Sequence, residues 1–305
     1  MANLEHLRVL LAVADEGGFA AAARRLRISP PAVTRAIAAL ENHLGARLLH
    51  RTTRSVRLTE VGDRFAQDAR RVLAELEEAE ASARGAHGEP QGELAITAPV
   101  MFGRLHVAPV LLDFLAGHAK VQARVLFVDR VVHLMDEGFD VAVRIASLPD
   151  SSFTAVRLGS VRRVVVASPG YLARLGEPAT PAELPSHRGV GFAGSGGSPA
   201  RWTFAAPGDT TAHETPQPQM PLRLNAVDVA IEAALAGHGL ARVLSYQVRE
   251  HIAHGRLRRV LQPFEPPPVP VHLVYGEGRK AAAKVRAFVD HAARSLRAHP
   301  ALNEA

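Results

Sequence analysis

The stretch FAAAARRLRISPPAVTRAIAALENHL, residues 19–44, predicts two helices joined by a short turn. The first helix, residues 19–26, contains four consecutive alanines, which favour helix and let a neighbouring helix approach closely. Residues 27–29 form the turn. The second helix is expected to begin near Pro31, because a proline is well suited to the first helical position, where its missing N–H would have had no partner.

The second of these helices has one apolar face and one polar face. Apolar residues recur at spacings of four, three and four, and they predict one buried stripe made of Val33, Ile37, Leu40 and Leu44. The outer face is left to Pro30, Thr34, Arg35 and Ala38. A helix that is polar and basic near its N-terminus, held across a second short helix, has the geometry of a recognition helix in the major groove of DNA. An ordinary amphipathic helical hairpin would show the same pattern.

The residues that follow favour the DNA-binding interpretation. LLHRTTRSVRL, residues 48–58, predicts two short strands joined by a polar turn. Arg51 and Arg54 in this hairpin are placed to contact phosphates or to enter a minor groove beside the recognition helix. Residues 1–58 contain nine Arg, no Lys and four acidic residues, so they carry +5 of the whole chain's +6. The basic charge is concentrated in the segment that would meet DNA.

Residues 59–87 predict one long helix. Thr59 can cap its start, and Glu60 and Asp63 lie in the first turn, where the helix dipole favours negative charge. Apolar residues recur at nearly heptad spacing, at Val61, Phe65, Ala69, Val72, Leu76, Ala79 and Ala83. Such a stripe packs either against its own domain or against a second copy of the helix. The heptad spacing favours a dimer helix, and the breakers Gly85, Gly88, Pro90 and Gly92 then mark a domain boundary.

From residue 92 onward, strand-like runs alternate with helical ones, which favours a mainly parallel α/β sheet. The first series of strands and helices covers 94–97, 102–117, 121–128, 131–137 and 139–145. The second series covers 162–168, 169–175, 222–224, 227–236, 239–244 and the helix after Tyr246. A proline-rich connector, 265–270, returns the chain to a strand at 271–276 and a helix at 280–297. The chain thus passes from the first series to the second and back again, and these two crossings imply two lobes with a cleft between them. The Pro/Thr-rich stretch 206–221 is expected to be a loop.

Residues 4–87 resemble the N-terminal region of the LysR-type transcriptional regulators. A first helix, Leu4 to Asp15, and the stretch GGFAAAARRLRISPPAVTRAIAALENHLGARLLHRTTRSVRLTEVG correspond to that family in order and in spacing. The resemblance implies a winged helix-turn-helix domain over residues 1–58, a dimerising linker helix and hinge over 59–89, and an effector-binding domain over 90–305. That last domain would be α/β and similar to type 2 periplasmic binding proteins, with lobe I at about 90–160 and 267–305 and lobe II at about 161–266.

The resemblance and the residue pattern together place DNA-binding residues on the turn, the recognition helix and the wing, at Ser29, Pro30, Pro31, Thr34, Arg35, Arg51 and Arg54. The position of Pro30 often carries a glutamine or another hydrogen-bonding side chain in the family, whereas Pro30 offers only an apolar contact. We therefore expect Thr34 and Arg35 to read bases. The implied partners are promoter DNA and a second copy of the chain, with Val61, Phe65, Val72 and Leu76 in the dimer seam. The dimer would place two recognition helices about 34 Å apart, and dimers would assemble into tetramers.

The expected effector site follows from topology, because ligands of open α/β sheets bind outside the carboxyl ends of the strands. Its residues are Thr97, Pro99, Val100, Phe102, Arg144 and Asn225. Free N–H groups at the strand-to-helix loops would favour an anionic effector, and Arg144 would pair with its carboxylate. Structural alternatives are a buried strand hydroxyl for Thr97, a surface salt bridge for Arg144 and a helix N-cap for Asn225. The loop at residues 193–198 borders the cleft or is a plain turn.

The composition, 47% hydrophobic and 22% charged over 305 residues, is typical of a soluble globular protein with about two domains. We expect no membrane span, because no run approaches the roughly 18 apolar residues required. The first residues lack the features of a signal peptide, which predicts a cytoplasmic protein.

Catalytic and metal-binding functions find little support in the sequence. Ser195 lies in AGSGG, which lacks the first glycine of a G-x-S-x-G nucleophile elbow. The chain has no Cys, and the helical pair His251 and His254 has no third metal ligand nearby. We expect no catalysis, no metal and no cofactor. The alternative class is a small-molecule solute-binding receptor, which residues 92–305 alone would fit, but the basic N-terminal segment favours a sequence-specific DNA-binding regulator.

Overall fold

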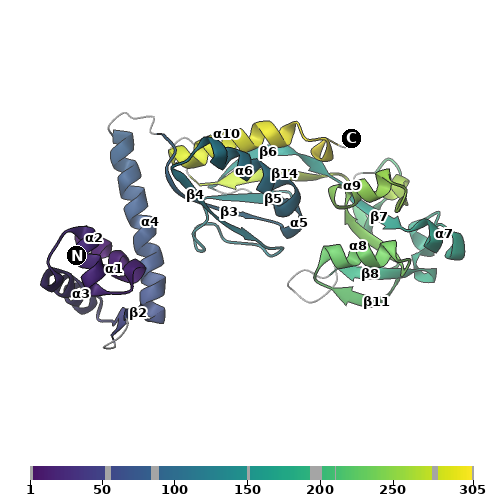
Figure 1. Cartoon of the computed structure of the whole chain (residues 1–305). Helices are drawn as coiled ribbons and strands as arrows, with labels where there is room; N and C mark the ends of the chain where they lie inside the picture. Colours follow the sequence, from purple (N-terminus) through teal and green to yellow (C-terminus); the bar gives the residue numbers. More distant parts are fainter. Residues whose placement is uncertain are drawn as a thin grey trace. The chain divides into compact units, whose positions relative to one another are not determined.

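The computed structural model describes residues 3–51, 56–83, 89–149, 152–192, 201–209, 211–276 and 281–303. The chain divides into two units, residues 1–88 and 89–305 (Figure 1). In its described part, the first unit is mainly helical, and the second unit contains two five-stranded sheets. These sheets define two lobes of the second unit, called lobe I and lobe II below.

The described residues of the N-terminal unit form three short helices, a two-stranded wing and a long linker helix. These elements are α1 (Leu4–Glu16), α2 (Phe19–Leu26), α3 (Pro30–Leu44), β1 (Leu49–Arg51), β2 (Val56–Leu58) and α4 (Glu60–Ala83). Strands β1 and β2 pair antiparallel, which confirms the predicted wing. Helix α3 begins one residue earlier than expected, at Pro30, and Ser29 is its N-cap.

The apolar stripe of α3 is confirmed at three of its four positions. Val33, Ile37 and Leu40 are completely buried in the core of the N-terminal unit. Leu44 is 37% exposed, so its assignment to the buried stripe is wrong. The physical reason is the helix end: Gly45 adopts a left-handed conformation directly after Leu44, so Leu44 belongs to a last turn that extends past the core.

Lobe I contains a five-stranded sheet in the order β4-β3-β5-β14-β6. Its strands are β3 (Gly92–Ala98), β4 (Val121–Phe127), β5 (Val141–Ile145), β6 (Thr154–Val161) and β14 (Val269–Tyr275). Its helices are α5 (Val100–Phe102), the π-helical η1 (Gly103–Val107), α6 (Ala108–Gly117), α10 (Ala283–Arg297) and η5 (Pro300–Leu302). Strands β3, β4 and β5 are parallel, but β14 runs antiparallel to β5 and β6, so this sheet is mixed rather than mainly parallel.

Lobe II contains a second mixed sheet in the order β11-β8-β12-β7-β13. Its strands are β7 (Arg163–Ala167), β8 (Arg188–Phe192), β11 (Gln219–Leu224), β12 (Leu240–Leu244) and β13 (Arg258–Val260). The remaining elements are α7 (Pro169–Leu175), η2 (Pro181–Ser186), the hairpin of β9 (Thr203–Ala205) and β10 (Ala212–Glu214), α8 (Val227–Leu235), α9 (Ser245–Ala253) and η3 (Gln262–Phe264). Apolar side chains cover both faces of the sheet, as its buried strands require.

Two predicted elements are wrong. Residues 131–133 have no regular structure and residues 134–137 form turns, so no helix is present. The carboxylate of Glu137 accepts from the backbone N–H of His133 and from the side chain of Arg130. The stretch 206–221 is not a plain loop, because it contains β10 and the start of β11. Gln217 stabilises this region: its side-chain oxygen accepts from the N–H of Trp202 at 2.8 Å, and its amide donates to the carbonyl of the same residue.

Among the described residues, one helical run is long and apolar enough to cross a membrane by length and composition, contrary to the expectation from the sequence. This run is Val100–Gly117, with a mean hydropathy of 1.4 over 18 residues. It comprises α5, η1 and α6, and Phe102, Val107 and Phe114 are buried in the core of lobe I. Core packing accounts for its apolar character.

Candidate nucleic-acid interface and effector site

The start of α3 presents the predicted DNA-binding residues to solvent. Ser29, Pro30, Pro31, Thr34 and Arg35 are all exposed, whereas the opposite face of the helix is buried. The hydroxyl of Thr34 donates to the carbonyl of Pro30 at 3.2 Å, and it keeps an oxygen lone pair available as an acceptor. Within the described residues, the guanidinium of Arg35 has no ion pair that would neutralise it. An arginine guanidinium without an ion pair, on an exposed helix, can donate two hydrogen bonds to the edge of a guanine.

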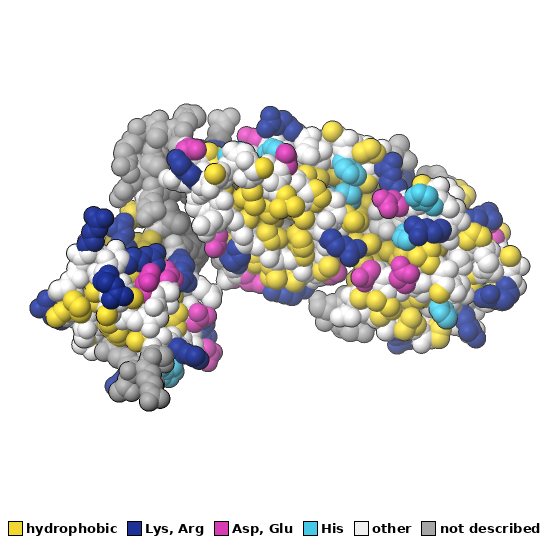
Figure 2. Space-filling view, in the orientation of Figure 1, with side chains coloured by type: hydrophobic (Ala, Val, Ile, Leu, Met, Phe, Trp, Pro, Cys, Tyr) yellow, Lys and Arg dark blue, Asp and Glu magenta, His cyan; other side chains and the backbone are white. Residues whose placement is uncertain are grey.

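The charge around α3 is basic. Exposed arginines of the N-terminal unit include Arg24, Arg27, Arg35 and Arg47, and Figure 2 shows basic side chains on its visible face. Arg51 belongs to β1, but its side chain lies outside the described residues, and so does the whole of Arg54. The predicted phosphate contacts of these two wing arginines therefore stay predictions.

The linker helix is tied to the wing at its first turn. The hydroxyl of Thr59 accepts from the N–H of Gly62 at 2.9 Å, which confirms Thr59 as the cap of α4. The same hydroxyl donates to the carbonyl of Arg47 at 2.8 Å, and the N–H of Thr59 donates to the carbonyl of Leu48 at 2.9 Å. These bonds fix the direction in which α4 leaves the DNA-binding fold.

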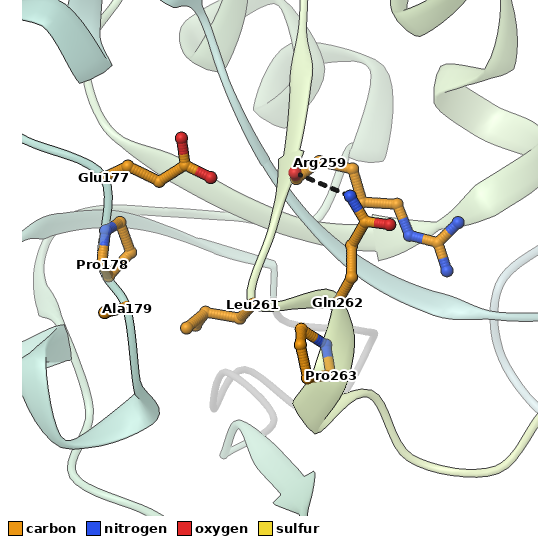
Figure 3. Close-up of a pocket in the computed structure, with 7 residues that line it drawn as sticks. All are labelled: Glu177, Pro178, Ala179, Arg259, Leu261, Gln262 and Pro263. Carbon is orange, nitrogen blue, oxygen red and sulfur yellow. Dashed lines mark hydrogen bonds between the residues drawn. The ribbon is translucent and has the colours of Figure 1, made fainter. Parts of the chain in front are cut away.

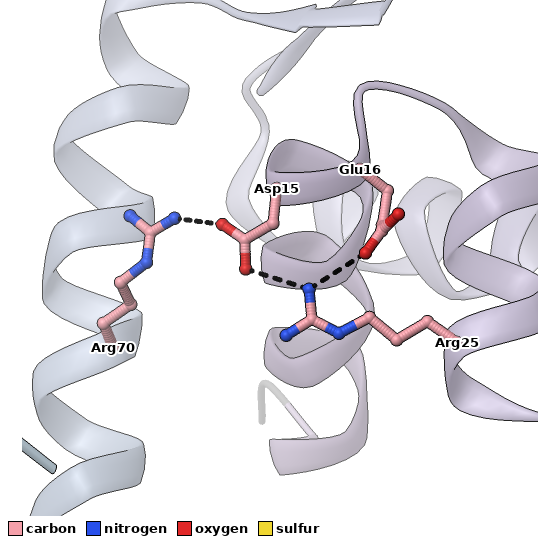
Figure 4. A network of polar contacts seen from close by, with 4 residues as sticks. All are labelled: Asp15, Glu16, Arg25 and Arg70. Atoms are coloured by element: carbon pink, nitrogen blue, oxygen red, sulfur yellow. Dashed lines mark hydrogen bonds and ion pairs between the residues drawn. The ribbon is translucent and has the colours of Figure 1, made fainter. Parts of the chain in front are cut away.

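An ion-pair network links α4 to α1 and α2 (Figure 4). One oxygen of Asp15 accepts from Arg70 of α4 at 2.7 Å, and the other accepts from Arg25 of α2 at 3.4 Å. Arg25 also pairs with Glu16 at 3.3 Å. Each of these side chains is more than one-third exposed, so the network contributes little free energy of folding, but it fixes the orientation of three helices.

The apolar residues of α4 lie on two faces. Ala69 and Leu73 are buried in the core of the N-terminal unit, and Phe65 packs against that core. Val61 and Val72 are 46% and 43% exposed. Packing within the chain therefore accounts for Ala69 and Phe65 of the predicted seam. Val61 and Val72, with the partly exposed Leu76, are available to a second copy, and their role in a dimer stays a prediction.

The predicted effector residues of lobe I meet at one edge of its sheet. Thr97 of β3 pairs in parallel register with Ala142 of β5, so the carboxyl ends of both strands lie together. Thr97 is buried in its strand. The N–H of Val100, expected to meet an anion, donates to the carboxylate of Asp129 at 3.0 Å. A carboxylate of the chain itself thus occupies that position.

Two further predicted residues of lobe I have contacts of their own. The guanidinium of Arg144 donates to the carbonyl of Val132. Partial burial lowers the pKa of Arg144, and the nearby carboxylate of Glu137 opposes this shift. Phe102 is fully buried in the core, and Pro99 is the N-cap of α5. Their contact with an effector stays a prediction.

In lobe II, Asn225 is exposed between β11 and α8. The N-cap of α8 is Ala226, so the alternative that Asn225 caps this helix is wrong. Asn225 follows β11, which runs parallel to β8, and its side chain makes no hydrogen bond within the described residues. It therefore remains available to a ligand.

Two surface pockets lie in lobe II and contain none of the predicted effector residues. One has a volume of about 380 Å³ and is lined by Glu177, Arg259, Leu261 and Gln262 among others (Figure 3). Its charged groups are paired, because Arg258 binds Glu177 at 2.9 Å and Arg259 binds Glu265. The other, of about 560 Å³, includes Arg174, which donates to the carbonyl of Gly237 at 3.0 Å.

A buried aromatic cluster joins α9 to lobe I, and the sequence did not reveal it. His106 of the π-helical η1 packs against Phe102, Tyr246 and His299, with ring centroids 4.6 to 5.4 Å apart. Neither ring nitrogen of His106 has a hydrogen-bond partner in the described part of the chain. Burial, and then the charge of His299, lower the pKa of His106 from 6.5 to about 4. This histidine is therefore neutral at pH 7.

This neutral histidine predicts a loss of stability in mild acid. The unfolded chain takes up the proton near pH 6.5, whereas the folded chain resists it until about pH 4, so the free energy of unfolding falls as the pH drops through this range. At about 1.4 kcal/mol per pKa unit, the expected loss by pH 4 is about 3 kcal/mol. Urea unfolding at several pH values should show a shallower pH dependence for His106→Phe than for the parent. The exposed-site control His238→Gln should keep the parent's dependence, and equal slopes for all three proteins would contradict the assignment.

The fold and the exposed basic helix define a class: a winged helix-turn-helix DNA-binding protein that carries a two-lobed α/β domain. Residues 4–63 match the family described as bacterial regulatory helix-turn-helix protein, lysR family. Residues 87–297 match the LysR substrate binding domain. The chain belongs to the LysR family of bacterial transcriptional regulators.

Known relatives cover nearly the whole chain. An HTH-type transcriptional regulator of Xanthomonas campestris is 35% identical over 292 residues, which are 94% of this chain and 84% of the relative. The HTH-type transcriptional regulator PtxR of Pseudomonas aeruginosa is 35% identical over 297 residues, covering 97% and 93%. The structure of CrgA, a LysR-type regulator from Neisseria meningitidis, matches with a TM-score of 0.60 at 29% identity, covering 97% and 99%. This protein is thus a LysR-type transcriptional regulator with an effector-binding domain, not a solute-binding receptor alone.

Proposed function

We propose that this regulator reads promoter DNA with the start of α3. Thr34 and Arg35 contact base edges in the major groove, Ser29, Pro30 and Pro31 lie against the DNA beside them, and Arg51 and Arg54 contact the backbone or the minor groove. The exposure of these five residues at the start of α3, on a helix whose Val33, Ile37 and Leu40 are completely buried, carries this proposal. The protein acts in the cytoplasm as a homodimer that assembles into a tetramer, and it catalyses no reaction.

We further propose that the effector is a small organic anion. It binds at the carboxyl ends of the strands, in the region of Thr97, Pro99, Val100, Phe102, Arg144 and Asn225. The parallel register of β3 and β5 and the position of Asn225 after β11 support this location. Effector binding changes the geometry of the paired DNA-binding units and so controls transcription.

The Arg35→Ala variant tests the DNA-binding proposal. Loss of a bidentate arginine contact should cost about 1–3 kcal/mol of discrimination at one base position. Genomic fragments retained by the purified parent would supply the binding site, and fluorescence anisotropy on single-base variants of that site would measure the discrimination.

The matched control is Arg64→Ala, which removes an exposed arginine of α4 whose one ion pair within the described residues is with the exposed Glu60 of the same helix, at 3.7 Å. This control should retain the parent's sequence preference. If Arg35→Ala also retains it at every position, Arg35 does not read a base. If the parent retains no specific fragments, the proposal that it reads promoter DNA in a sequence-specific way is wrong.

A further inference from the structure

Two arginines from strands about 80 residues apart lie together in lobe II. Strands β7 and β12 pair antiparallel, with Arg163 opposite Leu244 and Arg242 opposite Val165. Arg163 and Arg242 are thus diagonal neighbours on the same face of the sheet. Diagonal positions are about 7–8 Å apart, within reach of long side chains.

This arginine pair, Arg163 and Arg242, lies at the edge of the sheet where ligands are expected. Strands β8, β11 and β12 are parallel, so their carboxyl ends share an edge with the start of the antiparallel β7. The chain enters lobe II at this point, since β6 ends at Val161. The N–H of Arg162 donates to the hydroxyl of Ser245 at 3.1 Å, and the N–H of Ser245 donates to the carbonyl of Arg162 at 2.8 Å. The pair therefore borders the connection between the lobes.

The charge of the pair is not neutralised by any described carboxylate. Arg242 donates to the carbonyl and hydroxyl of Thr203, at 3.0 and 3.1 Å, and to the carbonyl of Arg201. All of these acceptors are uncharged. Arg163 is exposed and makes no hydrogen bond or ion pair within the described residues. Elsewhere in lobe II, the arginines Arg258 and Arg259 each have a carboxylate partner.

The environment of the pair disfavours positive charge. Burial lowers the pKa of Arg242 to about 10, with a further contribution from the positive charge of Arg163. Partial burial, which removes water from the guanidinium, also lowers the pKa of Arg163. Both side chains still carry their charge at pH 7, so an anion placed between them would relieve their repulsion and replace lost water contacts.

We propose that Arg163 and Arg242 bind the anionic group of the effector, a carboxylate or a chemically similar oxyanion, on lobe II. This inference rests on the proposed function, which gives the effector a negative charge. It assigns the main contact with that charge to the arginine pair instead of Arg144. Arg144 already donates to the carbonyl of Val132 and has Glu137 nearby. Arg242 has only uncharged acceptors, and Arg163 has no partner within the described residues. No described carboxylate therefore offsets the charge of the pair, and its guanidinium groups can donate several hydrogen bonds to one oxyanion.

Thermal unfolding of the full chain in sodium benzoate, succinate or sulfate tests the inference, with sodium chloride at the same ionic strength as the reference. We expect at least one of these anions to raise the melting temperature of the parent in a saturable way, as site binding requires. Calorimetric titration should show that Arg163→Gln weakens this binding about tenfold or more, the loss expected for one charge-assisted contact. Arg163→Gln removes no described contact, so it should fold, whereas Arg242→Gln serves as the second variant.

The matched control is Arg188→Gln, the same change at the opposite, amino end of β8 in the same sheet. It should bind the anion as the parent does. Equal affinity in Arg163→Gln and the parent would overturn the inference, as would the absence of saturable binding by all three anions. If only Arg144→Gln loses binding, the anion binds on lobe I, and the effector proposal stands without the arginine pair. DNA binding by each variant is measured separately and reports on the regulator function alone.

Discussion

The Gly62→Ala variant is expected to lose most of its DNA binding, because its N-terminal unit should no longer fold stably. A Cβ at this position would lie 2.0 Å from the carbonyl oxygen of Leu48 and 2.8 Å from its carbonyl carbon. That carbonyl also accepts from the N–H of Thr59, so neither backbone can move away without breaking the start of α4. Overpacking commonly costs 1–3 kcal/mol, and this clash is with backbone, so we expect a loss of about 3 kcal/mol.

Hydrogen exchange of the α1, α2 and α3 amides, measured on the full chain, checks this prediction together with anisotropy on the specific DNA site. The matched control is Gly18→Ala, in the same unit, where a Cβ would meet no atom within 4 Å and the backbone is extended. It should change the free energy of unfolding by less than about 1 kcal/mol. If Gly62→Ala exchanges and binds DNA as the parent does, α4 does not approach Leu48 this closely.

The second large effect is expected from Val72→Glu combined with Leu76→Glu, which should dissociate the dimer. Val72 is 43% exposed and Leu76 is partly exposed, so glutamates there should leave the N-terminal unit folded and act on the proposed partner helix. An unpaired charge buried in an apolar seam costs about 3–5 kcal/mol, which would raise the dissociation constant at least hundredfold.

Sedimentation velocity at micromolar concentration would show monomers for the double variant. The control, Gln67→Glu, adds a negative charge at an exposed position of α4 outside the predicted seam, and it should keep the parent's oligomeric state. An unchanged oligomer in the double variant would mean that Val72 and Leu76 lie outside any interface.

The sequence alone determined the features that depend on residues close together in the chain. Helix α3 follows, to within one residue at its start, from Pro31 and from the spacing of its apolar residues. The start of the linker helix follows from Thr59, which caps it as expected. Helix caps and amphipathic periodicity are local properties, because each arises from interactions within one or two turns. The basic charge of residues 1–58 is likewise a sum over the sequence, and together with these helices it was enough to predict DNA binding.

Only the tertiary structure decided which side chains are buried and which residues from distant segments lie side by side. Periodicity shows that α4 carries an apolar stripe, but not that Leu73 is buried while Val72 remains exposed. Gly62 is required because the backbone of Leu48, in the connection between α3 and β1, approaches it closely, and Arg163 acquires its neighbour Arg242 through strand pairing. The physical reason is that register and close approach are set by contacts between distant parts of the chain, and such contacts leave no periodic mark on the segments that make them.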